Sequence, residues 1–110
     1  MVNYNYDLGF KIDRWELKNQ INKFDDFVAT YDNSTSYQVT IKYQVDIPDY
    51  LKVDLKRDKD KYEVTIMVYE SGKVTQTGPC EEINKQVYVI FIKIIREIRS
   101  SIEKNKPKFF

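Results

Sequence analysis

One segment near the C-terminal end restricts the possible folds of this chain more than any other. Between residues 79 and 104, apolar side chains recur every three or four residues, the spacing of an α-helix. The first stripe consists of Ile83, Val87, Ile90, Phe91, Ile94, Ile98 and Ile102. The second stripe consists of Tyr88, Val89, Ile92 and Ile95. A helix that is apolar on nearly all sides is buried on more than one side, whereas one sheet covers only one of them.

The residues around the start of this segment support a helix rather than a strand. Pro79 is suited to the first helical position, because the first turn of a helix has no internal use for its missing N–H. Glu81 and Glu82 suit the positive end of the helix dipole. We therefore predict a helix of about 25 residues, although the run from Val87 to Ile95 alone is also compatible with a strand.

Much of the remaining chain alternates between apolar and polar residues. The alternation covers residues 2–8, 37–45, 51–55 and 64–68, and it is typical of strands with one buried face. Ser71-Gly72 predicts a tight hairpin turn, since glycine readily adopts positive φ, and a short return strand is expected over residues 73–77. Turn residues over 32–36 and a charged tip over 56–61 separate the strands.

A shorter helical region is expected between the first two strands. Asp13 is a candidate N-cap, and Glu16 stands three residues later, as in a capping box. Apolar residues then recur at helical spacing, with Asp25-Asp26 as a break between two short helices: Leu17, Ile21, Phe24 and Val28. The element order predicts an α+β fold, with helices on one face of a curved antiparallel sheet. Residues 1–104 form one domain, and residues 105–110 are a short basic and aromatic tail.

Composition excludes several classes of function. The chain has 110 residues, no histidine and one cysteine, so histidine-dependent nucleophiles, histidine-ligated zinc, thiolate clusters and an internal disulfide are excluded. No membrane-spanning run or signal pattern is present, and an intracellular protein is expected. The acidic pairs Asp25-Asp26, Asp58/Asp60 and Glu81-Glu82 are explained by a helix break, a turn and a first helical turn. We predict no catalytic activity, metal or cofactor.

Two motifs resemble one repeat of the TATA-box-binding protein (TBP) family. The first is the stretch Tyr69 to Gly78, with Glu81-Glu82 beyond it, which is similar to that family's Ser-Gly-Lys hairpin, Thr-Gly strand end and long helix. The second is the stretch Leu8 to Asp13, at the entry to the first helix. The resemblance implies a half-saddle whose concave sheet lies on the minor groove of A·T-rich DNA and whose helices bind other transcription proteins. A complete saddle has two repeats, so a homodimer or a second subunit is implied.

The resemblance carries over to individual residues. It implies DNA contacts from eight of them: Asn3, Asn5, Tyr37, Met67, Tyr69, Lys73, Thr75 and Thr77. Tyr69 stands where the family has a wedging phenylalanine, and its hydroxyl makes it a poorer wedge. Lys73 keeps a phosphate-contacting position. The family's arginines on the second strand have no counterpart, because Ser36 and Tyr43 occupy about those places.

The resemblance and the alternation disagree about the strand expected over residues 37–45. The resemblance places one set of side chains on the concave face: Tyr37, Val39, Ile41 and Tyr43. The alternation buries the same set under the helices, and a one-residue bulge would reverse the choice. Residues 46–62 are an insertion relative to the family's short connection, with room for an extra strand.

Two functions from different classes remain open. The first is a transcription-related subunit that contacts A·T-rich DNA, located in the nucleus, in a viral factory or virion if the protein is viral, and otherwise in the cytoplasm. The second is a TBP-fold protein-assembly module that binds partners through Tyr88, Val89, Ile92 and Ile95, unless the first helix covers these residues. The nine tyrosines suit base stacking or simple sheet packing, and the basic residues 85–110 suit an interaction surface or a solvated helix face. Abundant Lys, Ile, Tyr and Asn suggest A·T-rich coding, as in a large DNA virus or a protist.

Overall fold

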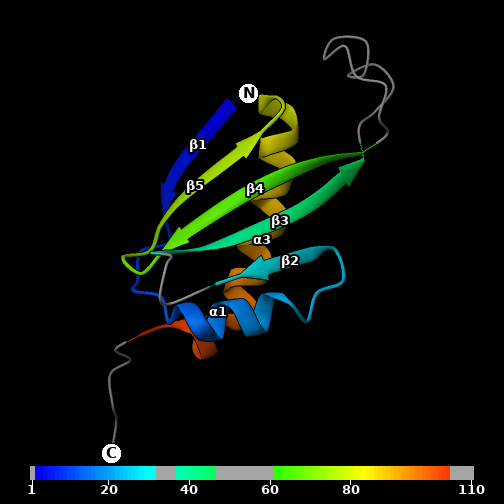
Figure 1. Ribbon diagram of the computed structural model, residues 1–110. Coiled ribbons are helices and arrows are strands. Elements are labelled where there is room, and N and C mark those ends of the chain that lie inside the picture. The colour runs from blue at the N-terminus through cyan, green and yellow to red at the C-terminus, as the bar shows by residue number, and fades with distance from the viewer. Residues whose placement is uncertain (1, 32–36, 47–60, 105–110) are drawn as a thin grey trace, which may run out of the picture.

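The computed structural model describes residues 2–31, 37–46 and 61–104. Its elements are β1 (Val2–Asp7), α1 (Arg14–Ile21), β2 (Phe27–Thr30), β3 (Gln38–Asp46), β4 (Lys61–Tyr69), β5 (Lys73–Gly78) and α3 (Glu81–Ile102). The strands form one antiparallel sheet in the order β1-β5-β4-β3-β2 (Figure 1). The predicted α+β fold is confirmed. The turn over residues 32–36, the strand over 51–55, the charged tip up to residue 60 and the tail over 105–110 lie outside the described residues.

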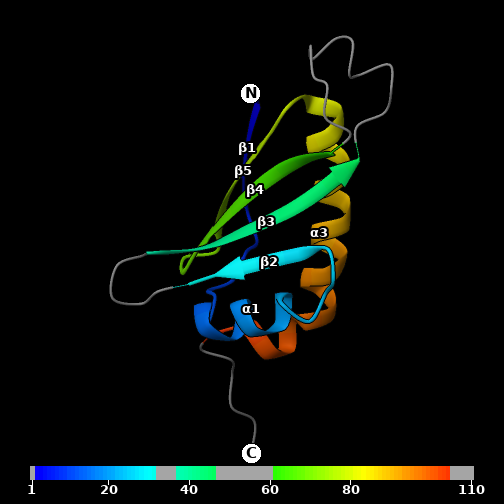
Figure 2. The same ribbon diagram turned by 45° about the vertical axis from the view of Figure 1, so that its right-hand side comes forward.

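The core lies between one face of the twisted sheet and the two described helices. Figure 2 shows α3 running along this face, with α1 beneath β2 and beside the C-terminal half of α3. The first apolar stripe of α3 packs here, apart from Ile90, which is 38% exposed. The sheet contributes the buried side chains of alternate residues, among them Val39, Ile41, Val64, Ile66, Val68 and Val74.

The side chains of β3 follow the alternation and contradict part of the family comparison. Val39 and Ile41 are fully buried in the core, and Tyr43 packs against it. Their placement on the concave face is therefore wrong, because burying branched aliphatic side chains removes more apolar surface from water than burying their neighbours would. Tyr37 lies just before β3 and is 82% exposed.

The prediction of a second short helix after α1 is also wrong. α1 ends at Ile21, and the chain returns as the short strand β2, in which Val28 is 59% exposed. The side-chain amide of Asn22 explains the change of direction, since it accepts from the Ala29 N–H (2.8 Å) and donates to the Ala29 carbonyl (3.0 Å). Phe27 and Ala29 are then buried on alternate positions of the edge strand.

The helix starts differ in detail from the sequence expectations. α3 has 22 residues and begins at Glu81, with Cys80 as N-cap, so Pro79 precedes the helix instead of opening it. Asp13 caps α1 as predicted, with its carboxylate accepting from the Glu16 N–H (3.2 Å). The Asp13 N–H, however, donates to the carbonyl of Ile102 (2.7 Å), at the end of α3. The start of α1 is therefore hydrogen-bonded to the end of α3. The Glu16 side chain does not complete a capping box, because the Asp13 N–H already has this partner.

A buried polar network joins α3 to β1 and β5. Gln76 and Asn84 are completely buried. The Gln76 amide donates to the Asn84 carbonyl (2.7 Å) and accepts from the Tyr6 hydroxyl (3.0 Å), while the Asn84 amide donates to the Val2 carbonyl (2.8 Å). Gly78 leaves the space for this network, because a Cβ there would collide with the Asn84 side chain. Fixed polar partners set the position of α3 on the sheet more narrowly than apolar packing does.

Candidate nucleic-acid interface

The face of the sheet opposite α3 carries mostly uncharged polar side chains, and we call it the open face. Strand register arranges them in rows across the sheet. One row is Asn3, Thr77, Thr65, Lys42 and Val28; the next is Asn5, Thr75, Met67, Thr40 and Thr30. Among the described residues no helix packs on this face, as the views from two directions show (Figures 1 and 2).

Seven of the eight predicted DNA-contacting residues lie together on the open face. Asn3, Asn5, Met67, Thr75 and Thr77 belong to the two rows, while Tyr69 and Lys73 flank the hairpin between β4 and β5. The exception is Tyr37, which precedes β3 and belongs to neither row. Its backbone carbonyl instead accepts from the Arg14 side chain (2.9 Å).

Cross-strand hydrogen bonds orient the two asparagines. The Thr77 hydroxyl donates to the Asn3 side-chain carbonyl (2.9 Å), and the Thr75 hydroxyl donates to that of Asn5 (3.1 Å). Each asparagine therefore keeps its NH₂ group for a further acceptor. Base edges in the minor groove of A·T pairs present only acceptors, so this arrangement suits them chemically.

The hairpin that presents Tyr69 and Lys73 is tightly built. Gly72 adopts a φ of +94°, and its N–H donates to the Tyr69 carbonyl (2.9 Å). A Cβ at Gly72 would collide with the backbone carbonyl of Phe10. The Leu8 N–H also donates to the Gly72 carbonyl (2.8 Å), so the β1 end and the hairpin are fixed to each other. The predicted turn with positive φ is confirmed.

The charge of the open face is balanced among the described side chains. Lys42 forms an ion pair with Glu63 (3.4 Å), which also accepts from the Gln44 amide (3.0 Å). Lys73 stands opposite Asp7 in the register of β1 and β5. Phosphate neutralisation supplies much of the affinity of a protein for DNA. This face therefore offers hydrogen-bonding groups, but little net attraction for phosphates.

The predicted protein interface on α3 is divided between the core and the surface. Ile95 is only 3% exposed, whereas Val89 is 48% exposed. Tyr88 and Ile92 are half-buried, and the Tyr88 ring contacts the Tyr6 ring edge-to-face, with centroids 4.8 Å apart. This flank of α3 thus lies beside β1, a neighbour that the sequence did not indicate.

A cluster of charges that the sequence did not reveal joins the β4–β5 hairpin to the start of α1 and to the chain just after α3. Glu70, after β4, forms ion pairs with Arg14 (3.0 Å) and Lys104 (3.2 Å). The hydrogen bond from Lys104 and the nearby positive charges lower the pKa of Glu70. The cluster borders a depression of about 220 Å³ that Trp15 and Tyr31 also line. Its members are far apart along the chain, so no local pattern could have indicated it.

Comparison with family models, with curated proteins and with solved structures finds no match for this chain. The likeness to the TBP family therefore rests on the motifs and on the residue correspondences given above. None of the helices in the described part of the chain is long and apolar enough to cross a membrane.

Proposed function

We propose that this chain is a TBP-like, non-enzymatic subunit in transcription that contacts the minor groove of A·T-rich DNA with the open face of its sheet. The observation that carries the proposal is the gathering of seven implied contact residues on one face that no described helix covers. Such a role locates the protein with DNA, in a nucleus, a viral factory or a virion.

The side chains of the open face divide the recognition chemistry among them. The NH₂ groups of Asn3 and Asn5 donate to the groove acceptors, while the hydroxyls of Thr75 and Thr77 hold the two asparagine side chains in position. The Tyr69 ring, beside the hairpin, acts as the wedge that partly unstacks a base step. A minor groove made only of A·T pairs lacks the guanine NH₂ group, so it leaves room for these contacts.

The balanced charge implies that one copy binds DNA weakly. Lys42 is already paired with Glu63, and Lys73 stands beside Asp7. A second TBP-like repeat, in a homodimer or on another subunit, raises the affinity because binding of the second half becomes intramolecular. We therefore expect the functional unit to contain two open faces.

The test is fluorescence anisotropy with an A·T-rich and a G·C-rich duplex at about 50 and 200 mM salt, the range over which phosphate contacts are visible. We expect preference for the A·T-rich duplex, loss of that preference in Tyr69→Ala, and uniformly weaker binding in Lys73→Ala. Lys93→Ala, an equal change on the exposed side of α3, is the matched control and should bind as the wild type does. No binding to either duplex at the lower salt, at concentrations where dimers form, refutes the proposal.

The second candidate is a protein-assembly module whose open face does not contact DNA. The balanced charge of that face favours it, as does the exposure of Val89 beside Tyr88 and Ile92. This candidate predicts absence of DNA binding at every salt concentration and unchanged behaviour of Tyr69→Ala.

A further inference from the structure

No strand among the described residues pairs with the outer edge of β1. β1 is the first strand in the sheet order, and within the described residues it pairs only with β5 (Figure 1). The hydrogen bond from the Leu8 N–H to the Gly72 carbonyl continues the β1–β5 register. Since hydrogen-bonded pairs alternate in an antiparallel ladder, Val2, Tyr4 and Tyr6 direct their backbone groups at β5. The backbone N–H and C=O groups of Asn3, Asn5 and Asp7 then point outward.

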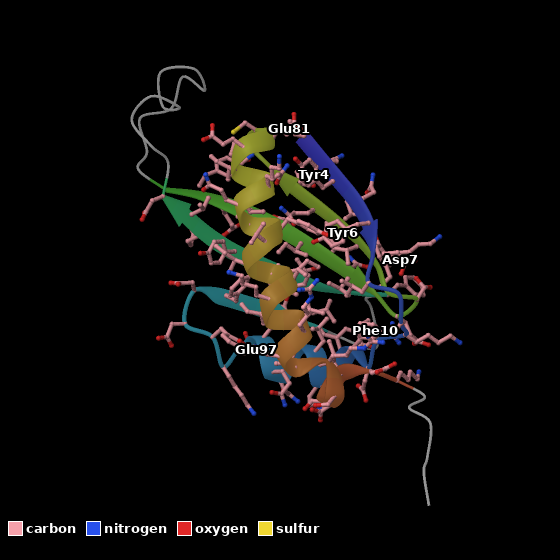
Figure 3. The ribbon with its side chains drawn as sticks, turned by 180° about the vertical axis from the view of Figure 1, so that it is seen from behind. Tyr4, Tyr6, Asp7, Phe10, Glu81 and Glu97 are labelled. Atoms are coloured by element: carbon pink, nitrogen blue, oxygen red, sulfur yellow. The ribbon has the colours of Figure 1, made fainter. Side chains whose placement is uncertain are left out.

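A groove lined by aromatic side chains runs along this edge on the α3 side. Figure 3 shows Tyr4 and Tyr6 on the face of the sheet that carries α3. The groove has two adjoining hollows of about 380 and 180 Å³, which share Tyr6 and Tyr88 as lining residues. The larger hollow lies level with Tyr4, and the smaller one is bordered by Leu8 and Ile92.

The charges that line the groove are predominantly positive. Lys85 borders the larger hollow, and Arg96 and Arg99 border the smaller one. Asp7 is an acidic lining residue. Arg99 is engaged locally, since it lies 4.4 Å from the centroid of the Phe10 ring and pairs with Glu103 (3.3 Å). Lys85 and Arg96 therefore provide the positive charge available to a partner at the two hollows.

We propose that the β1 edge and this groove bind an extended segment of a partner protein, which adds to the sheet as a further strand. Its backbone pairs with the outward groups of Asn3, Asn5 and Asp7. Its alternate side chains face α3, where aromatic or apolar ones enter the two hollows and acidic ones lie beside Lys85 and Arg96. This surface is separate from the open face, so the proposal does not depend on contact with DNA.

The spacing of the hollows defines a probe. They lie level with Tyr4 in β1 and with Leu8 just after it, four residues apart, so two aromatic side chains should be four residues apart in the partner. The probe is the fluorescein-labelled peptide Glu-Thr-Phe-Thr-Val-Thr-Phe-Thr-Glu. One control replaces both Glu by Lys. A second control keeps the composition but exchanges one Phe with its neighbouring Thr, which places the rings on opposite faces of the strand.

Anisotropy titration with the full chain should give a Kd of the order of 10 to 100 μM for the probe and at least about tenfold weaker binding for both control peptides. The double variant Lys85→Glu/Arg96→Glu should lose binding of the probe by at least about tenfold. Lys93→Glu makes the same type of charge change on an exposed position of the same helix and should have no effect. Thermal unfolding of each variant checks that the fold is intact.

Backbone methylation of the probe tests the strand pairing without altering the protein. The backbone N–H groups of every second residue of the probe face β1, while those of the residues between them face away. N-methylation of the residues whose N–H groups face β1 should therefore abolish binding, and N-methylation of the residues between them should leave it nearly unchanged. The proposal is overturned by equal effects of both N-methylations, by no binding up to about 1 mM, or by equal affinity for the Lys peptide. It is also overturned if sedimentation shows a dimer that Lys85→Glu/Arg96→Glu dissociates, because a second copy is then the occupant.

Discussion

Replacement of Gln76 by leucine should destabilise the protein although the two side chains are similar in size. Gln76 is completely buried on β5, where its amide accepts from the Tyr6 hydroxyl (3.0 Å) and donates to the carbonyl (2.7 Å) and the side-chain oxygen (3.3 Å) of Asn84. Leucine removes these bonds but leaves the Tyr6 hydroxyl and the Asn84 side chain in place. Burial raises the pKa of Tyr6, so its hydroxyl keeps a proton that then has no acceptor.

The magnitude follows from the groups that lose their partners. A buried polar group left without a partner costs about 1–3 kcal/mol, and two such groups result, on Tyr6 and on Asn84. Burial of the leucine side chain offsets about 1.5–2 kcal/mol of this cost. We expect a net loss of about 2 kcal/mol in the free energy of unfolding, seen in urea titration, with a decrease of about 8 °C in Tm for a domain of this size.

The double variant Gln76→Leu/Tyr6→Phe separates this mechanism from a simple loss of packing. Because the second change removes the orphaned hydroxyl, the double variant should be about 1 kcal/mol more stable than Gln76→Leu alone. Gln44→Leu is the control, since Gln44 is exposed on β3 and its replacement should change stability by less than about 0.5 kcal/mol. A Gln76→Leu variant as stable as the wild type, or strictly additive effects in the double variant, would refute the reasoning.

Three further predictions concern stability. The pKa of Tyr6 is raised above 10.0 in the folded protein, so the protonated Tyr6 hydroxyl contributes fully to stability below the pKa of the unfolded state. This contribution decreases as the pH rises beyond that value. Tyr6→Phe should therefore reduce the alkaline loss of stability, measured by urea titrations between about pH 9 and pH 11. Because the pKa of Glu70 is lowered from 4.5, the ionised Glu70 carboxylate contributes to stability above that pH. This contribution decreases as the pH falls through the pKa of Glu70 in the folded protein. Glu70→Gln should therefore weaken the acid dependence, and equal slopes in both proteins would contradict the Lys104 pairing. Gly72→Ala should lower the free energy of unfolding by about 1–3 kcal/mol or more, because alanine is strained at a φ of +94° and its Cβ would meet the Phe10 carbonyl; an unchanged Tm would exclude this hairpin geometry.

Local patterns in the sequence predicted the parts of the fold that depend on near neighbours. The alternation over β3 correctly placed Val39 and Ile41 in the core, and the spacing of the isoleucines correctly predicted α3. β2 was missed because a four-residue strand is too short for a clear period, and Val28 happened to continue the helical spacing of α1. The structure shows that the Asn22 side chain, bonded to Ala29, directs the chain there.

Long-range polar contacts could not be read from the sequence, although one of them left a signal. Gln76 stands at the buried position of the alternation in β5, two residues after Val74, where a polar residue needs a partner inside the protein. The identity of that partner, Asn84, depends on how α3 lies across the sheet. The pairing of Glu70 with Arg14 and Lys104 gives no local signal, because it joins residues that only the fold brings together.

The open face also has features that follow from the local sequence pattern and features that depend on strand register. A period of two is enough to gather Asn3, Thr75 and Met67 on one face, so the open face was predictable once the strands were. The ion pair between Lys42 and Glu63 was not, because it depends on the register of β3 and β4. A face with groove-compatible side chains and no excess positive charge binds DNA only where other contacts supply the attraction. The salt dependence of DNA binding therefore distinguishes the two candidate functions better than affinity alone. A second repeat adds phosphate contacts and makes the decrease of affinity with salt steeper. An assembly module shows no salt-dependent DNA binding.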